Sequence, residues 1–400
     1  MVFWSNAGYP YKDQVGAQLA QEFQQKGGPT ISWTDTLYGD FMKKLLTTVA
    51  AGTPPDLSYV DRYVTQAYAA RGVLTAMDDL IAKSKTVQKD MFFSLLVHDT
   101  NYHGKTYAVP HGPDVGLLYY NKDLFQAAGL DPEKPPLTWD DAQATAQKLT
   151  KKSGSDYTQI GWSPAQDWGV PWMVAYWQQG GQLLNADETK ATFDNPQAVA
   201  ALDFLKKVYD LEGVYTDITK FISGIGDARK AFLGNKVAMR WDTHSSIHDF
   251  DVAKINFKWG ASYFPLPPGG NHANYMGGWG LVIPKGAKQA DGAFQYLEYL
   301  CTSDPQIRWA EAWNCMPTVK DVAQSQAYIK GDQLRDLAVK EMPTAQWVIA
   351  APGGDQIIGT EVGIMGDVLS GKQSSHDALA SANQKTQGLL DEAYKNSVLK

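Results

Sequence analysis

Several short stretches of the sequence place aromatic side chains beside carboxylates, amides or an arginine. Indole and phenol rings offer flat apolar faces and lose little rotamer entropy on binding. Asp, Asn, Gln and Arg hold hydroxyl groups through planar hydrogen bonds. This combination suits the binding of a polyhydroxylated ligand, or its cleavage, because paired carboxylates also hydrolyse glycosides. The candidates in the first third of the chain are Trp4, Asn6, Tyr9, Tyr38, Asp61 and Arg62.

Tryptophans recur in the middle and late parts of the chain. The segment WSPAQDWGVPW is dense in tryptophan for a core segment, so we expect one or two of its indoles to face a cleft. The segment MGGWGLV places Trp279 after two glycines, which would let a ligand approach closely. Trp279 is therefore predicted to stack on a ligand. The further candidates are Asp167, Trp168, Trp172, Trp241, Asp242 and Gln356.

Each candidate also has a purely structural interpretation. Trp4 could pack in a core, and Asp61 with Arg62 could form a solvated pair or a helix cap. Gln356 lies in PGGDQI, which reads equally as a surface loop. Both interpretations stay open for these residues.

The stretch YAVPHGPDVGLLYYNKDLF, residues 107–125, reads as a strand, a break at Pro110 and Pro113, a second strand and a helix start. Proline fixes φ, so such a connection bends at defined points. It is either a hairpin within one sheet or a crossing from one lobe to another. Asp114 follows the break, where it could contact a ligand or only cap a turn.

Enzyme signatures are missing from the sequence. We find no nucleophile elbow, P-loop, HExxH motif or metal-spaced Cys/His cluster. His244 and His248 form an i,i+4 pair, but a zinc site needs further ligands that the sequence does not supply. No cofactor is expected, and a glycoside hydrolase is the second interpretation after a binding protein.

Length and composition set outer bounds. A chain of 400 residues suggests two domains or lobes. A net charge of −7 argues against nucleic acid or an anionic membrane as the partner. Cys301 and Cys315 could form a bridge or remain buried thiols. Val2 already begins a strand with no charged and apolar leader before it, as after removal of an export signal or in a cytoplasmic protein.

The first part of the chain alternates strands and helices. Apolar spacing predicts strands at 2–4, 30–33 and 56–60 and helices at 12–25 and 41–51. This order implies a largely parallel α/β sheet with crossover helices. Ligands of such sheets bind beyond the carboxyl ends of the strands, which is where the first-third candidates lie.

Several segments together resemble a known family. The motif segments, in chain order, are AAGTPPDLSYVD, GKTYAVP, YYNKDLFQAAG, AFLGNKVAMRWD and GGWGLVIPKGAKQADGAFQYLEYL. In this order they are similar to the extracellular solute-binding protein family 1 of ABC importers, which includes maltose-binding proteins. The resemblance covers nearly the whole chain. AMRWDTH departs from the family form A-M-x-x-x-G-x-W, which puts the roles of Trp241 and Asp242 in doubt.

The resemblance implies a periplasmic-binding-protein fold, in which two α/β lobes close on a ligand like a clam. The first lobe would comprise 1–111 plus 264–316, and the second 112–263 plus 317–400. PHGP would then be the first crossing between lobes. Asp114, six residues before Tyr120, would be the ligand-binding carboxylate.

The same resemblance implies an extracytoplasmic protein, periplasmic or lipid-anchored, that delivers its ligand to the membrane permease of an ABC importer. The ligand would be a mono- or oligosaccharide, or a glycerophosphodiester as in some members. The candidates carry more Asp and Trp than Arg, which favours a neutral sugar. We expect a monomer with no nucleic-acid partner.

Overall fold

The computed structural model describes residues 1–6, 10–36, 38–164, 170–346 and 348–398. It begins with the predicted β-α-β-α-β alternation: β1 and β2 pair in parallel, and so do β1 and β3. The carboxyl ends of these three strands therefore meet at one edge of the sheet, as expected. The strands within the described residues are β1 Val2–Asn6, β2 Ser32–Thr36, β3 Leu57–Asp61, β4 Asn101–Tyr102, β5 Lys105–Thr106, β6 Val109–Asn121, β7 Lys151–Ser153, β8 Asp156–Trp162, β9 Val237–Thr243, β10 Trp259–Ser262, β11 Asn274–Val282 and β12 Ala345–Gln346.

Helices cover the sheet and dominate the later part of the chain. Sequence signals set several helix starts: the Thr138 side chain caps α7, and Asn195 caps α9 with proline at its first position. The helices are α1 Pro10–Gln25, α2 Tyr38–Ala50, α3 Thr65–Ala70, α4 Asp78–Ile81, α5 Ser94–Asp99, α6 Lys122–Ala127, α7 Trp139–Leu149, α8 Val170–Trp177, α9 Pro196–Glu212, α10 Tyr215–Ile225, α11 Ala228–Leu233, α12 Ile247–Ala253, α13 Ala290–Leu300, α14 Ser303–Trp313, α15 Lys320–Ala323, α16 Gln326–Ile329, α17 Gln333–Glu341, α18 Gly354–Leu369 and α19 Ser375–Asn396. Short 3₁₀ turns include η1 Arg62–Val64, η4 His244–Ser246 and η5 Met342–Thr344.

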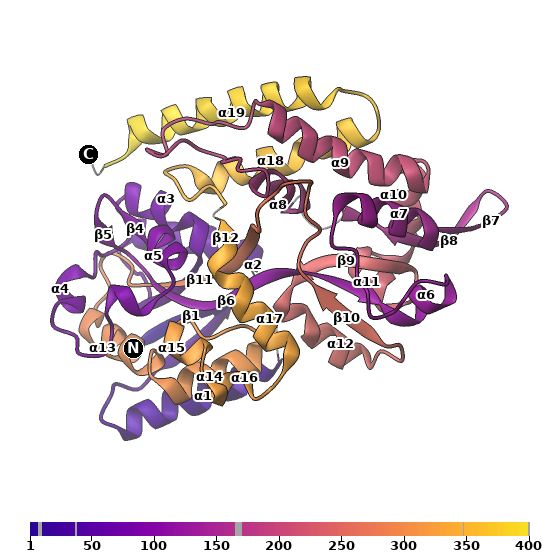
Figure 1. The fold of residues 1–400 in the computed structure, drawn as a ribbon. Coiled ribbons are helices and arrows are strands. Elements are labelled where there is room, and N and C mark those ends of the chain that lie inside the picture. The colour runs from indigo at the N-terminus through magenta and orange to yellow at the C-terminus, as the bar shows by residue number, and fades with distance from the viewer. Residues whose placement is uncertain (7–9, 37, 165–169, 347, 399–400) are drawn as a thin grey trace.

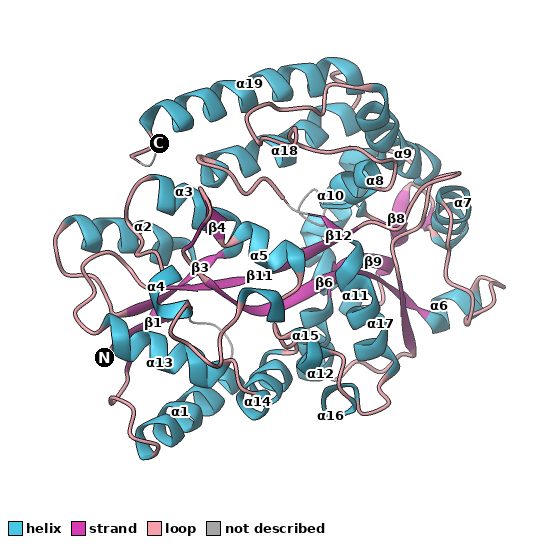
Figure 2. Cartoon of the chain, turned by 60° about the vertical axis from the view of Figure 1, so that its left-hand side comes forward, coloured by secondary structure: helices cyan, strands magenta, loops and turns pink. Residues whose placement is uncertain are grey.

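The main sheet runs through the whole molecule in the order β2-β1-β3-β11-β6-β9-β8-β7, with β10 joined to β6 and β12 to β11. Figure 2 shows the strands as one band, with α18 and α19 above it and α1 and α14 below. The first half of β6 pairs with β11, and its second half pairs with β9 and β10. The strand β6 therefore joins the two halves of the sheet.

The predicted break between two strands at PHGP is wrong. Residues 109–121 form one continuous strand that contains both Pro110 and Pro113. The chain bends within this strand at Gly112, whose φ of +54° lies in the left-handed region that glycine tolerates. The bend therefore comes from a glycine inside the strand, and the prolines do not end it.

The buried apolar side chains form separate cores on the two sides of this junction. One side is built from residues between 1 and 115 together with residues between 276 and 345. The other is built from residues between 117 and 273 together with residues between 348 and 390. Figure 1 shows these as two bodies, with α18, α19 and α9 side by side along the top.

The cysteines are not bridged. Cys301 and Cys315 are both buried free thiols, and burial raises the pKa of Cys301 to about 12. Of the alternatives that the sequence left open, buried thiols are therefore correct. In the part of the chain that the structure describes, no helix is long and apolar enough to cross a membrane.

Candidate ligand-binding site

Residues far apart in sequence meet where β6 and β11 pass between the two cores. Asp114 on β6 lies opposite Gly277 on β11. A Cβ atom at residue 277 would lie 2.3 Å from Oδ1 of Asp114, so only glycine leaves room for this carboxylate. The pairing shifts register between Gly277 and Trp279, which is a β-bulge. Bulges redirect side chains next to functional sites.

Asp114 is held by hydroxyl groups from the other half of the sheet. Ser245 in η4 donates its hydroxyl to Oδ2 at 2.8 Å, and the Thr243 hydroxyl also bonds the carboxylate. Burial raises the pKa of Asp114, and the negative charge of Asp242 raises it further. The two hydrogen bonds from Ser245 and Thr243 and the positive charge of Arg62 act in the opposite direction and lower it. A carboxylate so poorly hydrated gains from any further donor, including a ligand hydroxyl.

Aromatic rings flank this carboxylate. Tyr275 is half-buried and meets Trp241 edge-on, with ring centroids 5.7 Å apart. Burial raises the pKa of the Tyr275 phenol, and the charges of Asp114 and Asp61 act on it in the same direction. Trp279 is also half-buried and meets Tyr59 edge-on at 5.7 Å. Both half-buried rings retain surface that a ligand could cover.

Asp61 lies beside Trp279 in the site, and Arg62 holds the β11 backbone next to the site. Asp61 ends β3 directly opposite Trp279 in the pairing of β3 with β11. Arg62 is only 4% exposed, and its guanidinium donates to Asp99 and to the backbone oxygens of Gly277 and Met276. The arginine thus fixes the bulge next to Asp114, and its donors are engaged by the protein.

Three predicted ligand contacts are packed into the protein instead. Trp4 lies in the core with the Lys44 ammonium 4.7 Å from its ring centroid. Trp172 is 0% exposed, stacks on Tyr176 and donates its indole N–H to a backbone oxygen. Asp242 is 6% exposed and forms ion pairs with arginines of α11 and β9. Trp4 and Trp172 therefore do not reach the junction. Asp242 lies close enough to Asp114 to raise its pKa, but its own carboxylate is held by the two arginines.

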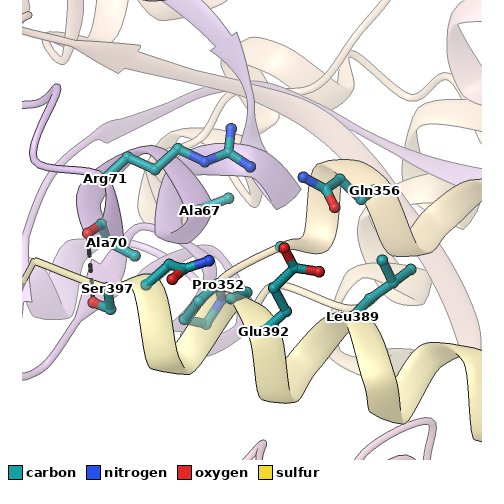
Figure 3. Close-up of a pocket in the computed structure, with 11 residues that line it drawn as sticks. Ala67, Ala70, Arg71, Pro352, Gln356, Leu389, Glu392 and Ser397 are labelled. Atoms are coloured by element: carbon teal, nitrogen blue, oxygen red, sulfur yellow. Dashed lines mark hydrogen bonds between the residues drawn. The ribbon is translucent and has the colours of Figure 1, made fainter.

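Trp241 and Gln356 meet only part of what was expected of a ligand contact. Trp241 borders the site through Tyr275, but it is 4% exposed because its ring covers Gly116. Gln356 is exposed on α18 and lines a different cavity, of about 90 Å³, between α3 and the helices α18 and α19. Figure 3 shows Gln356 and Arg71 reaching toward each other there.

The remaining candidates are not placed. Tyr9, Asp167 and Trp168 lie outside the described residues, and so do the side chains of Asn6 and Tyr38. The backbone of Asn6 ends β1 and that of Tyr38 begins α2, next to the carboxyl ends of β1 and β2. The described residues contain no group of three or more His, Cys, Asp or Glu side chains placed to hold a metal ion.

Sequence reasoning missed Tyr275, Thr243 and Ser245. Tyr275 and Gly277 are two residues apart on one strand, so the Tyr275 side chain lies on the face of the strand that Gly277 presents to Asp114. That spacing could have identified Tyr275 from NYMGGWG once Gly277 was placed opposite Asp114. Nothing in the sequence marks Thr243 and Ser245, because their approach to Asp114 depends on the pairing of β6 with β9.

Comparison with known proteins identifies the family. A family model described as a bacterial extracellular solute-binding protein matches residues 18–335. The diacetylchitobiose binding protein of Streptomyces coelicolor is 24% identical over 82% of this chain and 74% of its own length. The sn-glycerol-3-phosphate-binding periplasmic protein of Escherichia coli is 22% identical over 85% of this chain and 80% of its own length.

A solved structure extends the likeness to the fold. An ABC transporter solute-binding protein from Thermotoga lettingae, bound with α-D-tagatose, superposes with a TM-score of 0.83 at 25% identity, covering 98% of this chain and 99% of its own. The predicted two-lobed α/β fold is confirmed by this match. These relatives are named as binding proteins. The chain belongs to the bacterial extracellular solute-binding proteins.

Proposed function

We propose that this protein captures a mono- or oligosaccharide between its two lobes and delivers it to the permease of an ABC importer. The observation that carries the proposal is the half-buried Asp114 carboxylate, whose pKa is raised by burial, flanked by the half-buried rings of Tyr275 and Trp279 where β6 and β11 pass between the cores. Such a carboxylate accepts ligand hydroxyls, while the rings cover C–H faces. Relatives that are named for, or bound with, a sugar support this ligand class.

The packing of the buried side chains supports a proposed division into lobes. The sequence placed 317–345 in the second lobe, but its buried side chains pack with the N-terminal core. We therefore assign 1–115 plus 276–345 to the first lobe and 116–275 plus 346–398 to the second. The segments that cross are then β6, β11 and the chain that follows η5.

One side chain ties these crossings together. The Asn274 amide at the start of β11 donates to the Gly116 oxygen on β6 at 2.8 Å and to the Glu341 carboxylate, next to η5, at 2.9 Å. A single buried amide thus fixes the three crossings relative to one another. Closure would then be a rotation about this point, with flexing in the flanking residues.

A phosphate-bearing ligand is the second candidate, because one relative is named for sn-glycerol-3-phosphate. Phosphate recognition uses arginine or lysine with free donors. The arginines nearest the site in the described chain are engaged by carboxylates: Arg62 by Asp99, and Arg229 and Arg240 by Asp242. This arrangement favours a neutral sugar over a phosphate-bearing ligand.

The family assignment also supports the position of the protein in the cell. An extracellular solute-binding protein works outside the cytoplasm, in the periplasm or anchored to the outer face of the membrane. We propose that it acts there as a monomer whose macromolecular partner is the permease, with no nucleic acid involved. The net charge of −7 fits this partner set.

A thermal-shift screen tests the proposal. Sugars of increasing length and sn-glycerol-3-phosphate are added separately, because a ligand at about 100 times its Kd stabilises by about 2.7 kcal/mol. We expect a shift with at least one sugar and none with sn-glycerol-3-phosphate. Analysis of the sugar after long incubation tests the hydrolase alternative: cleavage products would contradict a pure binding role.

A further inference from the structure

A series of charged side chains in contact with one another connects the second lobe to β11. The Glu188 carboxylate contacts Nε2 of His98 at 2.8 Å, and Nδ1 of His98 contacts Asp99 at 2.9 Å. Asp99 accepts from Arg62, which in turn holds the Gly277 oxygen at 2.9 Å. Glu188 lies in the turn between Leu184 and Ala191 of the second core, whereas His98 lies on α5 beside the first.

The turn at 185–190 holds Glu188 in a defined position. Glu188 has a φ of +58°, a left-handed conformation that is uncommon for a residue with a side chain. The Asn185 side chain accepts hydrogen bonds from the backbone N–H groups of Thr189 and Lys190. The Tyr394 hydroxyl donates to the backbone oxygen of Glu188 at 3.2 Å. Backbone strain that is kept in place by several bonds is typical of functional positions.

The charges around His98 make this contact stronger than an ordinary surface pair. Burial alone would lower the pKa of His98, but the hydrogen-bonded carboxylates of Asp99 and Glu188 outweigh it and raise the pKa to about 9. Asp99 is 2% exposed on its side chain, so this charge pair is poorly hydrated. On the side of α3, the neutral Gln66 amide donates to the backbone oxygen of His98. His98 is therefore an imidazolium at neutral pH.

We propose that Glu188 and His98 form a latch between the lobes that stabilises the closed form and thereby raises ligand affinity without touching the ligand. The proposal rests on the lobe closure of the proposed function. Opening would separate Glu188 from His98 and leave the imidazolium with Asp99 alone. A contact made only in the closed form shifts the equilibrium toward that form, and ligand binds more tightly as a result.

A second ion pair lies on the same boundary between the lobes, which we call the seam. Arg71, at the end of α3, donates both terminal nitrogens to Asp355 on α18 at 2.8 Å each. Beyond it, the Tyr102 hydroxyl meets Ser397 at 3.1 Å, and Val398 donates to the Ala70 oxygen. Figure 1 shows α18 and α19 above this part of the first lobe. The latch is thus one part of a seam that lies away from the crossing strands.

The latch is predicted to depend on pH. A histidine whose pKa is higher in the latched form than in the open form, where Asp99 alone remains its partner, stabilises the latched form fully below its open-form pKa. This contribution is lost as pH rises through the latched value of about 9. Affinity for a neutral ligand should therefore be high at neutral pH and fall in the alkaline range.

The variants Glu188→Gln and His98→Gln test the latch, and Asp210→Asn is the matched control. Asp210 pairs with Lys206 within α9, so its variant removes the same charge without affecting the seam. The radius of gyration of the free protein is measured by small-angle scattering, and Kd by calorimetry with the best sugar of the screen. Thermal unfolding confirms that each variant is folded.

We expect both latch variants to raise Kd about three- to tenfold at neutral pH, to scatter as a more open particle, and to lose the alkaline fall in affinity. The control should match the wild type. Folded variants with unchanged Kd, pH profile and scattering would overturn the latch. If the wild type binds no sugar, the proposed function fails, and scattering alone decides the latch: more open variants support it, and identical profiles overturn it.

Discussion

Asp114 and Gly277 face each other across β6 and β11 so closely that a single methyl group at residue 277 would lie 2.3 Å from Oδ1 of the carboxylate. The backbone of Gly277 is not in the left-handed region, so the contact with Asp114 is what requires a glycine here. The identity of residue 277 and the position of the carboxylate are therefore coupled.

Gly277→Ala should displace the Asp114 carboxylate. Overpacking of this kind costs about 1–3 kcal/mol. Because the displaced group is a proposed ligand contact, we expect sugar affinity to fall together with the melting temperature. Calorimetry and thermal unfolding measure the two effects.

The control for this variant is Gly388→Ala on α19, where an added Cβ meets no atom within 4 Å. Alanine within a helix is favoured over glycine by about 0.5–1 kcal/mol. This variant should therefore unfold at the same or a higher temperature and bind normally. Normal binding by Gly277→Ala as well would show that the Asp114 position is not critical for the ligand.

Trp279→Ala tests the stacking surface. The ring is half-buried against Tyr59, so its loss should lower both sugar affinity and stability. Truncation of a central aromatic contact costs about 2–4 kcal/mol of binding free energy. Trp279→Phe keeps an aromatic ring and should recover part of that loss. A lower melting temperature with unchanged Kd would assign the ring to the core alone.

Glu212 gives a pH-dependent test of stability. This carboxyl is buried in the second lobe, and burial raises its pKa to about 8, although the backbone of Trp162 and the hydroxyl of Thr150 donate to it. A raised acid pKa stabilises the fold below the unfolded value of about 4.5 and loses that contribution as pH rises through about 8. Thermal stability should fall over this range.

Glu212→Gln should remove that part of the pH dependence, since a neutral amide oxygen can still accept from Trp162 and Thr150. Thermal unfolding of the wild type and the variant at a series of pH values makes the comparison. Parallel curves would contradict the assignment of the fall to Glu212.

Much of the fold could be predicted from local pattern. The alternation of strands and helices up to β3 follows from apolar periodicity, and the parallel pairing follows from the crossovers. Helix starts at Thr138 and Asn195 follow from capping chemistry. The course of β6 could not be predicted in the same way. A strand tolerates proline where one of its edges is unpaired, and this depends on the tertiary pairing: β11 pairs with the half of β6 that contains Pro110 and Pro113, and β9 pairs with the other half.

The site was less accessible from sequence. Asp61 and Trp279 were candidates because a strand end and a glycine pair mark them locally, and Asp114 was a candidate because of the family resemblance. The sequence around Trp172 or Asp242 does not show whether the side chain faces a ligand or the protein interior, because tertiary packing determines this. The Trp172 indole is enclosed in the core, and the Asp242 carboxylate is neutralised by the arginines of α11 and β9. Ser245 and the latch at Glu188 depend on contacts between distant segments, which no local pattern encodes.

Titration calorimetry of the wild type and Asp114→Asn with the best sugar of the screen tests the central claim most directly. Asparagine keeps the shape of the side chain but removes its charge, so we expect at least a tenfold higher Kd, equivalent to about 1.4 kcal/mol or more. The melting temperature of the free variant should not fall, because burial disfavours the charge that is removed. Asp210→Asn should bind as the wild type does. Equal dissociation constants for the wild type and Asp114→Asn would contradict a sugar site built around this carboxylate.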